Sequence, residues 1–98
     1  RYMIRSFRDS GSRDLAKGLA SKSARQLLPI ELHRRAKRLI AEIDFASSLK
    51  DLSRPANRLH ALSGDRKGQY SVSSNSQFRI CFWWKDGDVL EVEITDYH

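Results

Sequence analysis

The longest regular hydrophobic pattern in the chain lies between residues 29 and 47. Its apolar positions recur at alternating steps of four and three residues: Leu32, Ala36, Leu39, Ile43 and Ala46. This spacing places them along one face of an α-helix. Pro29 suits the first turn of such a helix, so the pattern predicts a helix from about Pro29 to Ser47. We expect its apolar stripe to pack against a sheet.

Shorter patterns on either side of this helix complete the expected fold. Alternation predicts a strand over residues 3–8, followed by a helix that carries Leu15 and Leu19 and breaks or loosens near residues 21–23. A connection over residues 49–57, which includes Pro55, precedes four short strands expected at 58–62, 69–74, 78–84 and 89–95. The order predicts an α+β domain over residues 1–98, with an N-terminal strand and two helices packed on a small, mainly antiparallel sheet.

The last two predicted strands form a hairpin whose register follows from the faces of their side chains. A two-residue turn at Asp86-Gly87 would put Phe82 opposite Glu91, so that core residues would share a face with carboxylates. A three-residue loop over 85–87, with glycine in the left-handed conformation, avoids this. It gives three apolar cross-strand pairs: Phe78 with Ile94, Ile80 with Val92 and Phe82 with Leu90.

Two polar residues are predicted to point away from the core, Arg79 from the hairpin register and His60 from the alternation of its own strand. Arg79 then stands across from Glu93, and a cross-strand ion pair worth ~0.2 to 1 kcal/mol is its ordinary interpretation. His60 is out of phase with Leu59 and Ala61, so it also leaves the core side. If both helices cover one face of the sheet, His60 and Arg79 lie on the face left open for a ligand.

Charge is unevenly distributed along the chain. Residues 1–84 carry 17 Lys and Arg against 7 Asp and Glu, whereas residues 85–98 carry 1 against 5, within a formal net charge of +6. A pI near 9.9 favours polyanionic partners, with RNA, DNA and an acidic protein all open. The predicted long helix carries a basic cluster, interpreted either as a solvated surface or as contacts for RNA phosphates: Arg34, Arg35, Lys37 and Arg38.

Several classes of protein and site are not expected. No run approaches the ~18 apolar residues of a membrane span and no signal-like segment follows the start, so we expect a soluble cytoplasmic protein without membrane partners. Cys81 is the only cysteine, which excludes an internal disulfide, and we interpret it as a buried hydrophobe. His33, His60 and His98 lack the spacing of metal ligands, so no metal or other cofactor is expected.

Five short motifs occur in order along the chain: Met3-Ile4-Arg5-Ser6-Phe7, Leu59-His60-Ala61-Leu62, Gly64-Asp65-Arg66, Phe78-Arg79-Ile80 and Asp96-Tyr97-His98. Their order and spacing resemble the HigB-type toxins of the RelE superfamily, bacterial toxin–antitoxin proteins that cut messenger RNA on the ribosome. The resemblance spans essentially the whole chain. Arg1 and Tyr2 precede the methionine, and we take them as a remnant of cloning.

The resemblance implies a ribosome-dependent endoribonuclease that inhibits translation and is neutralised by a small antitoxin with a helix-turn-helix domain. RNA can be cut without a metal when its 2′-hydroxyl attacks the adjacent phosphate, which requires a base, an acid and positive charge. A histidine pKa near ~6.5 suits proton transfer, and the arginine fork suits phosphate. The resemblance assigns five residues to this activity: His60, Arg79, Asp96, Tyr97 and His98.

The roles within this set are expectations. We expect His98 to act as general base or acid with Asp96 orienting it, and Tyr97 to stack on or hydrogen-bond the flanking nucleotide. Arg79 would stabilise the phosphate and His60 would be the second proton-transfer group. Two further residues are expected to contact RNA from a turn between glycines, Arg66, which matches the Gly-Asp-Arg of the family, and Lys67.

Three points remain open at the level of sequence. Some of these toxins have lysine where this chain has Ser63, so one positive charge is absent and cleavage is expected to be weaker or differently tuned. Phe82 and Trp84 fall on the core face, which leaves Trp83 as the candidate of this aromatic run for stacking on a base. The alternative function is a non-catalytic basic module that binds ribosomal RNA or acts with its antitoxin on operator DNA.

Overall fold

The computed structural model describes residues 3–54, 57–73 and 78–96, with the backbone alone for Met3 and Asp96. The regular elements follow in this order: β1 (Met3–Ile4), α1 (Ser10–Ala16), α2 (Lys22–Leu27), α3 (His33–Phe45), β2 (His60–Ala61), β3 (Gln69–Val72), β4 (Phe78–Lys85) and β5 (Asp88–Asp96). Short 3₁₀ turns lie at Ile30–Leu32, Leu49–Leu52 and Gly64–Arg66. Six residues named in the sequence analysis lie outside the described residues: Arg1, Tyr2, Pro55, Ser74, Tyr97 and His98.

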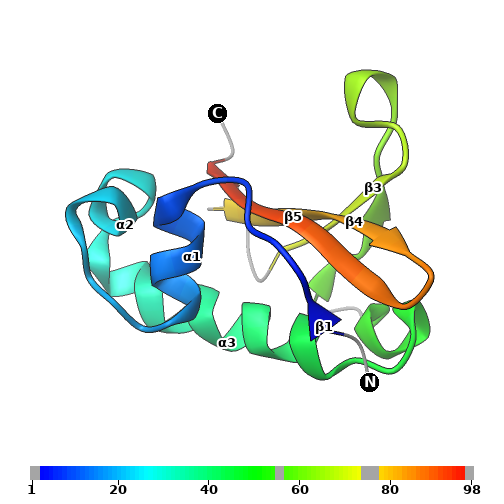
Figure 1. Ribbon diagram of the computed structural model, residues 1–98, viewed down its shortest axis with the longest axis horizontal. Coiled ribbons are helices and arrows are strands. Elements are labelled where there is room, and N and C mark those ends of the chain that lie inside the picture. Colours follow the sequence, from blue (N-terminus) through cyan, green and yellow to red (C-terminus); the bar gives the residue numbers. More distant parts are fainter. Residues whose placement is uncertain (1–2, 55–56, 74–77, 97–98) are drawn as a thin grey trace.

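The sheet has the strand order β1-β5-β4-β3-β2 (Figure 1). β1 runs parallel to β5, and the remaining neighbours pair in antiparallel fashion. The predicted α+β class and the mainly antiparallel sheet are therefore confirmed. Within the described ranges, no helix is long and apolar enough to cross a membrane.

The hydrophobic core lies between the helices and one face of this sheet. Ala36, Leu39 and Ile43 of α3 are buried, as the four-and-three spacing predicted, and Ile40 is buried beside them. From the sheet, the two long strands contribute these fully buried side chains: Phe78, Ile80, Phe82, Val89 and Val92. In Figure 1, α3 runs along this side of the sheet, with α1 next to it.

The N-terminal half of the chain departs from the prediction. The region expected to hold one helix that breaks or loosens near residues 21–23 contains two separate helices, because α1 ends at Ala16 and Gly18 adopts a left-handed φ of 77°. The hydroxyl of Ser21 then caps α2 by accepting a hydrogen bond from the backbone N–H of Ala24 at 3.1 Å. Leu19, expected one turn after Leu15 in the same apolar stripe, is instead 52% exposed.

The register of the β4–β5 hairpin is the main correction. Lys85 pairs with Asp88 across a two-residue turn at Asp86-Gly87, in which both φ angles are positive, so the predicted three-residue loop is wrong. The predicted cross-strand pairs are also wrong, since Ile80 pairs with Ile94 and Phe78 pairs with Asp96. The observed turn avoids carboxylates in the core through a β-bulge between Cys81 and Trp83.

The bulge lies on β5, where Glu91 and Val92 together oppose Phe82. Glu91 has a left-handed φ of 53°, and its backbone N–H donates to the Ser6 hydroxyl at 2.9 Å. The extra residue changes the phase of the strand, so that Val89 and Val92 both face the core although they are three residues apart. Glu91 itself is exposed.

Glu91→Gly is expected to be more stable than Glu91→Ala by about 1 kcal/mol. Both variants remove an exposed side chain, but alanine keeps the Cβ that disfavours a left-handed backbone, whereas glycine does not. Chemical denaturation of the two variants measures the difference in free energy of unfolding. Glycine ordinarily weakens a strand, so a less stable glycine variant would contradict the assigned conformation of Glu91.

Candidate functional site

The candidate site lies on the face of β2–β5 that α1 and α3 do not cover, called here the open face. Residues directly opposite each other in an antiparallel ladder project to the same face of the sheet. His60 pairs with Ser71, Ser71 with Cys81, and Cys81 with Glu93, which forms one row across four strands. Further open-face residues follow from the same ladders: Gln69, Arg79, Trp83, Leu90 and Thr95.

His60 and Arg79 both lie on the open face, as the alternation of the strands predicted. His60 is exposed at the edge strand β2, and Arg79 is half-buried on β4. Two strand spacings and one two-residue step along the strand put their Cα atoms about 12 Å apart. A nucleotide bound on this face can therefore lie between an imidazole and a guanidinium.

Arg79 does not pair with Glu93 as the ordinary interpretation expected. The observed register places Arg79 opposite Thr95, and its Nε donates a hydrogen bond to Thr95 Oγ1 at 3.2 Å. This contact fixes the position of the side chain at the end of the sheet where β5 reaches Asp96. The shift of partner from Glu93 to Thr95 comes from the two-residue turn and from the bulge at Glu91, each of which moves the register by one residue.

Glu93 instead binds Arg66, and sequence reasoning missed this contact. Arg66 Nη1 donates to Glu93 Oε1 at 2.9 Å and to Gln69 Oε1 at 3.2 Å. The two charged side chains are only 30% and 17% exposed, and Arg8 Nε lies 3.8 Å from the other Glu93 oxygen. The hydrogen bond to Glu93 raises the pKa of Arg66. The Gly-Asp-Arg turn is thereby attached to the middle of the open face.

Cys81 lies under this charged layer and is fully buried. Burial raises the pKa of its thiol, while Arg79 and Arg66 act in the opposite direction. A protonated, inaccessible thiol is a poor nucleophile. The interpretation of Cys81 as a small buried residue is confirmed, although it lies on the open-face side of the sheet.

The terminal motif continues from the same part of the sheet. Asp96 is the last residue of β5 and pairs with Phe78, the neighbour of Arg79 in β4. The backbone thus brings the start of Asp96-Tyr97-His98 next to the Arg79 strand, while Tyr97 and His98 lie outside the described residues. Among the residues that the structure describes, no cluster of His, Cys, Asp and Glu could hold a metal ion.

The basic residues predicted to contact RNA divide between two surfaces. Lys67 is exposed beside Arg66, at the end of the 3₁₀ turn near the open face. The other four are exposed on α3, on the opposite side of the sheet: Arg34, Arg35, Lys37 and Arg38. The structure therefore does not bring the α3 cluster together with His60 and Arg79.

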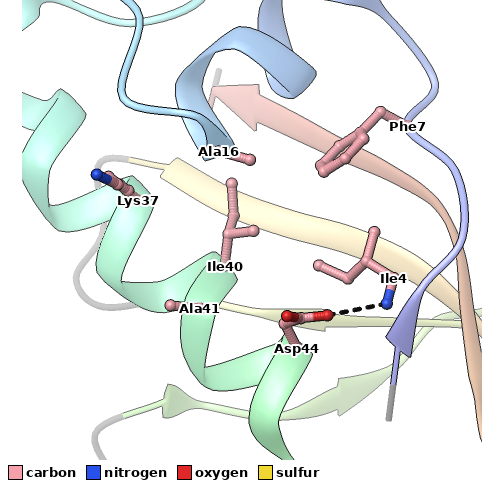
Figure 2. A pocket seen from close by; sticks show the side chains of 7 residues that line it. All are labelled: Ile4, Phe7, Ala16, Lys37, Ile40, Ala41 and Asp44. Carbon is pink, nitrogen blue, oxygen red and sulfur yellow. Dashed lines mark hydrogen bonds between the residues drawn. The ribbon is translucent and has the colours of Figure 1, made fainter.

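A groove of about 300 Å³ separates β1 from α3 (Figure 2). Its lining is mostly apolar and includes Phe7, Ile40 and Lys37. At one end, the backbone N–H of Ile4 donates to Asp44 Oδ1 at 3.0 Å. Asp44 thereby satisfies a donor on the outer edge of the sheet, which protects this edge against pairing with another strand.

The sequence of the chain is similar to a family of known proteins and to individual members of it. Residues 5–98 match the family described as the RelE-like toxin of the type II toxin–antitoxin system HigB. The chain is 32% identical over 96 residues to the endoribonuclease HigB of Proteus vulgaris, covering 98% of this chain and 100% of that protein. It is 35% identical over 73 residues to the toxin HigB-1 of Vibrio cholerae serotype O1, covering 74% and 77%.

One of the solved structures that match is the solution structure of the conserved hypothetical protein HP0894 from Helicobacter pylori. It has a TM-score of 0.42 and 16% sequence identity to this chain. The match covers 96% of this chain and 92% of the Helicobacter protein.

Proposed function

The chain belongs to the family of RelE-like HigB toxins of type II toxin–antitoxin systems, and on this premise we propose that it cuts messenger RNA on the ribosome and so inhibits translation. The relative from Proteus vulgaris is named an endoribonuclease, and it matches this chain over its entire length. The proposed site is the open face together with the terminal motif that follows β5. Its proposed catalytic residues are His60, Arg79, Asp96, Tyr97 and His98.

The observation that carries the proposal is the common face of His60 and Arg79. They come from strands separated by β3, and the ladders turn both away from the apolar core. Arg66 adds a second guanidinium that its contact with Glu93 holds over the centre of the same face. Imidazole and guanidinium groups around one nucleotide can supply the proton transfer and the positive charge that metal-independent phosphate transfer requires.

The proposed reaction begins with removal of the proton of a ribose 2′-hydroxyl by a general base. The 2′-oxygen attacks the adjacent phosphorus, and the bond from phosphorus to the 5′-oxygen of the next nucleotide breaks. A general acid donates a proton to this leaving oxygen, which gives a 2′,3′-cyclic phosphate and a 5′-hydroxyl. His60 and His98 would supply the base and acid, and Arg79 would stabilise the charge on the phosphate oxygens.

Asp96, Tyr97 and the ribosome would position the groups that react. Asp96 would orient His98, and Tyr97 would contact the flanking nucleotide. Few catalytic groups on a small scaffold gain most from imposed geometry, so a message held by the ribosome would be a far better substrate than free RNA. The α3 cluster, on the other side of the sheet, would contact ribosomal RNA phosphates while the open face holds the message.

The chain would act in the cytoplasm and be paired with an antitoxin. A small antitoxin with a helix-turn-helix domain would neutralise the chain, since the family acts in toxin–antitoxin pairs. Ser63 removes one positive charge from the turn before Arg66, so the rate would depend more strongly on the two arginines of the open face. No metal ion takes part in the proposed chemistry.

Cleavage products are expected to carry 2′,3′-cyclic phosphates and 5′-hydroxyls. The measurement is end-group analysis of message fragments from a translating extract, where 5′-hydroxyl ends are ligated to an adaptor only after treatment with a polynucleotide kinase. A hydrolytic nuclease would instead leave 5′-phosphates that ligate directly. Kinase-independent ligation of the new ends would therefore contradict attack by the 2′-hydroxyl.

A further inference from the structure

We propose that Trp83 forms a stacking subsite for a nucleobase that flanks the cleaved phosphate. This inference rests on the proposed function, because it takes the open face as the surface that binds single-stranded RNA. Trp83 is a large aromatic side chain on that face, 38% exposed, whereas its neighbour Trp84 turns toward the core. An exposed indole beside guanidinium groups is a typical platform for an unpaired base.

The indole ring is held in place by the turn that precedes β3. Gly68 adopts a φ of 99°, and a Cβ built on it would come within 2.5 Å of Trp83 Cζ3. The ring therefore lies directly against the main chain at a position where other residues would collide with it. On the same side it neighbours Gln69, which pairs with Trp83 and is buried. The subsite is thus built by the fold rather than formed by a mobile side chain.

Two arginine side chains, Arg66 and Arg79, lie along the open face between the ring and the end of the sheet where the terminal motif begins. Trp83, Cys81 and Arg79 are alternate residues of β4, so they form one column along the open face. The Arg66–Glu93 contact lies over the middle of this column, because Cys81 pairs with Glu93. About 13 Å of strand separates the Cα atoms of Trp83 and Arg79.

This column matches the alternating chemistry of a single RNA strand. Guanidinium groups would bind phosphates at Arg79 and Arg66, and the indole would take a base beyond them. Because Trp83 and Arg79 lie at opposite ends of the column, the indole would contact a flanking nucleotide and not the reacting one. Trp83 would therefore influence which message positions are cut, whereas Arg79 would determine the rate of the chemical step.

The binding test uses tryptophan fluorescence. In Trp84→Phe, Trp83 is the only tryptophan left, so its quenching reports directly on stacking. The probe is a single-stranded RNA oligonucleotide with 2′-O-methyl groups, which cannot be cut, at low salt. We expect quenching by this RNA and little quenching by an abasic strand of the same length, which keeps the phosphates. Equal quenching by the abasic strand would overturn the proposal.

Affinity for the same oligonucleotide tests the contribution of the ring. Trp83→Leu is expected to weaken binding on the order of 10-fold, while Trp83→Tyr keeps most of the affinity, because tyrosine also stacks. Phe45→Leu is the matched control, since it removes an exposed aromatic ring from α3 on the other side of the sheet. Thermal unfolding verifies that each variant is folded. Unchanged binding by folded Trp83→Leu would contradict the subsite.

Cleavage separates this inference from the proposed function. In a translating extract, Trp83→Leu is expected to change the distribution of cut positions, and Trp83→Tyr to restore it. If the unmutated chain cuts nothing, the proposed function fails while the fluorescence test still decides the subsite. If Trp83→Leu loses binding to the antitoxin but keeps RNA affinity and cut positions, Trp83 belongs to a protein interface and the proposal is wrong.

Discussion

Arg79→Ala is expected to lower the rate of message cleavage by about 10²- to 10³-fold, the usual cost of removing one donor that stabilises a transition-state charge. The guanidinium of Arg79 is positioned by its hydrogen bond to Thr95 and lies on the same face as His60. Alanine leaves the strand pairing unchanged, so the loss should appear in the chemical step. Single-turnover cleavage on programmed ribosomes measures it.

Two further variants distinguish geometry from charge. Arg79→Lys keeps the positive charge but loses the planar fork, so it should recover only part of the rate. Arg13→Ala removes the same charge from the exposed surface of α1 and should cut at the unmutated rate. If Arg79→Ala were folded, bound to ribosomes and as active as Arg13→Ala, Arg79 would have no role in cleavage.

His98→Ala is expected to lower cleavage by about 10²- to 10⁴-fold and to abolish growth arrest when expressed. A histidine that transfers a proton in the rate-limiting step contributes this range, and His98 is the proposed partner of Asp96 in the terminal motif. The loss should leave thermal unfolding and ribosome binding unaffected. Growth curves and cleavage by the purified variant provide the two measurements.

The matched comparison uses the other two histidines of the chain. His60→Ala should also be strongly impaired, because the reaction needs both an acid and a base. His33 lies at the start of α3, where its Nε2 is 2.9 Å from the carbonyl oxygen of Leu28, and His33→Asn should cut normally. Toxicity retained by His98→Ala would remove this residue from the catalytic set.

The open face could be predicted from sequence although the register could not. Over residues 78–81, the predicted and observed β4–β5 pairings differ by two residues, for example Ile80 with Val92 against Ile80 with Ile94, and between the bulge and the turn they differ by one. A shift of two preserves the face of Arg79, whereas the shift of one beyond the bulge moves Leu90 from the core face, opposite Phe82, to the open face, opposite Trp83. Arg79 was therefore assigned to the correct face but to the wrong partner.

The bulge was not predictable because its key residue gives no local signal. A left-handed backbone is ordinarily indicated by glycine or asparagine, and here it occurs at Glu91. The conformation is supported by a distant contact, the hydrogen bond to the Ser6 hydroxyl next to β1. Such contacts between remote segments do not appear in the periodicity of a single strand.

The contact between Arg66 and Glu93 illustrates the same limit within the site. The two residues are 27 positions apart, and they meet because the 3₁₀ turn before β3 extends over the row that contains Cys81. Motif and residue type could identify Arg66 as a candidate. Its partner, and hence the orientation of its guanidinium, depends on the tertiary arrangement of the turn and the sheet.

The α3 stripe shows where sequence was sufficient. Four-and-three spacing identified the buried face of this helix, since burial of apolar residues on one side depends mainly on local periodicity. The same periodicity placed the basic cluster of α3 outside the core. It did not indicate that the sheet lies between this cluster and Arg79, because that relation follows from the packing of α3 on the sheet.

The most direct test of the proposed function is a map of message 5′ ends. The map compares a translating extract, the same message without ribosomes, and the extract with His98→Ala in place of the unmutated chain. The proposal predicts new ends that require both ribosomes and His98. Equal cutting of naked RNA would contradict ribosome dependence. Absence of new ends from folded, ribosome-bound protein would contradict the endonuclease and favour a non-catalytic RNA-binding module.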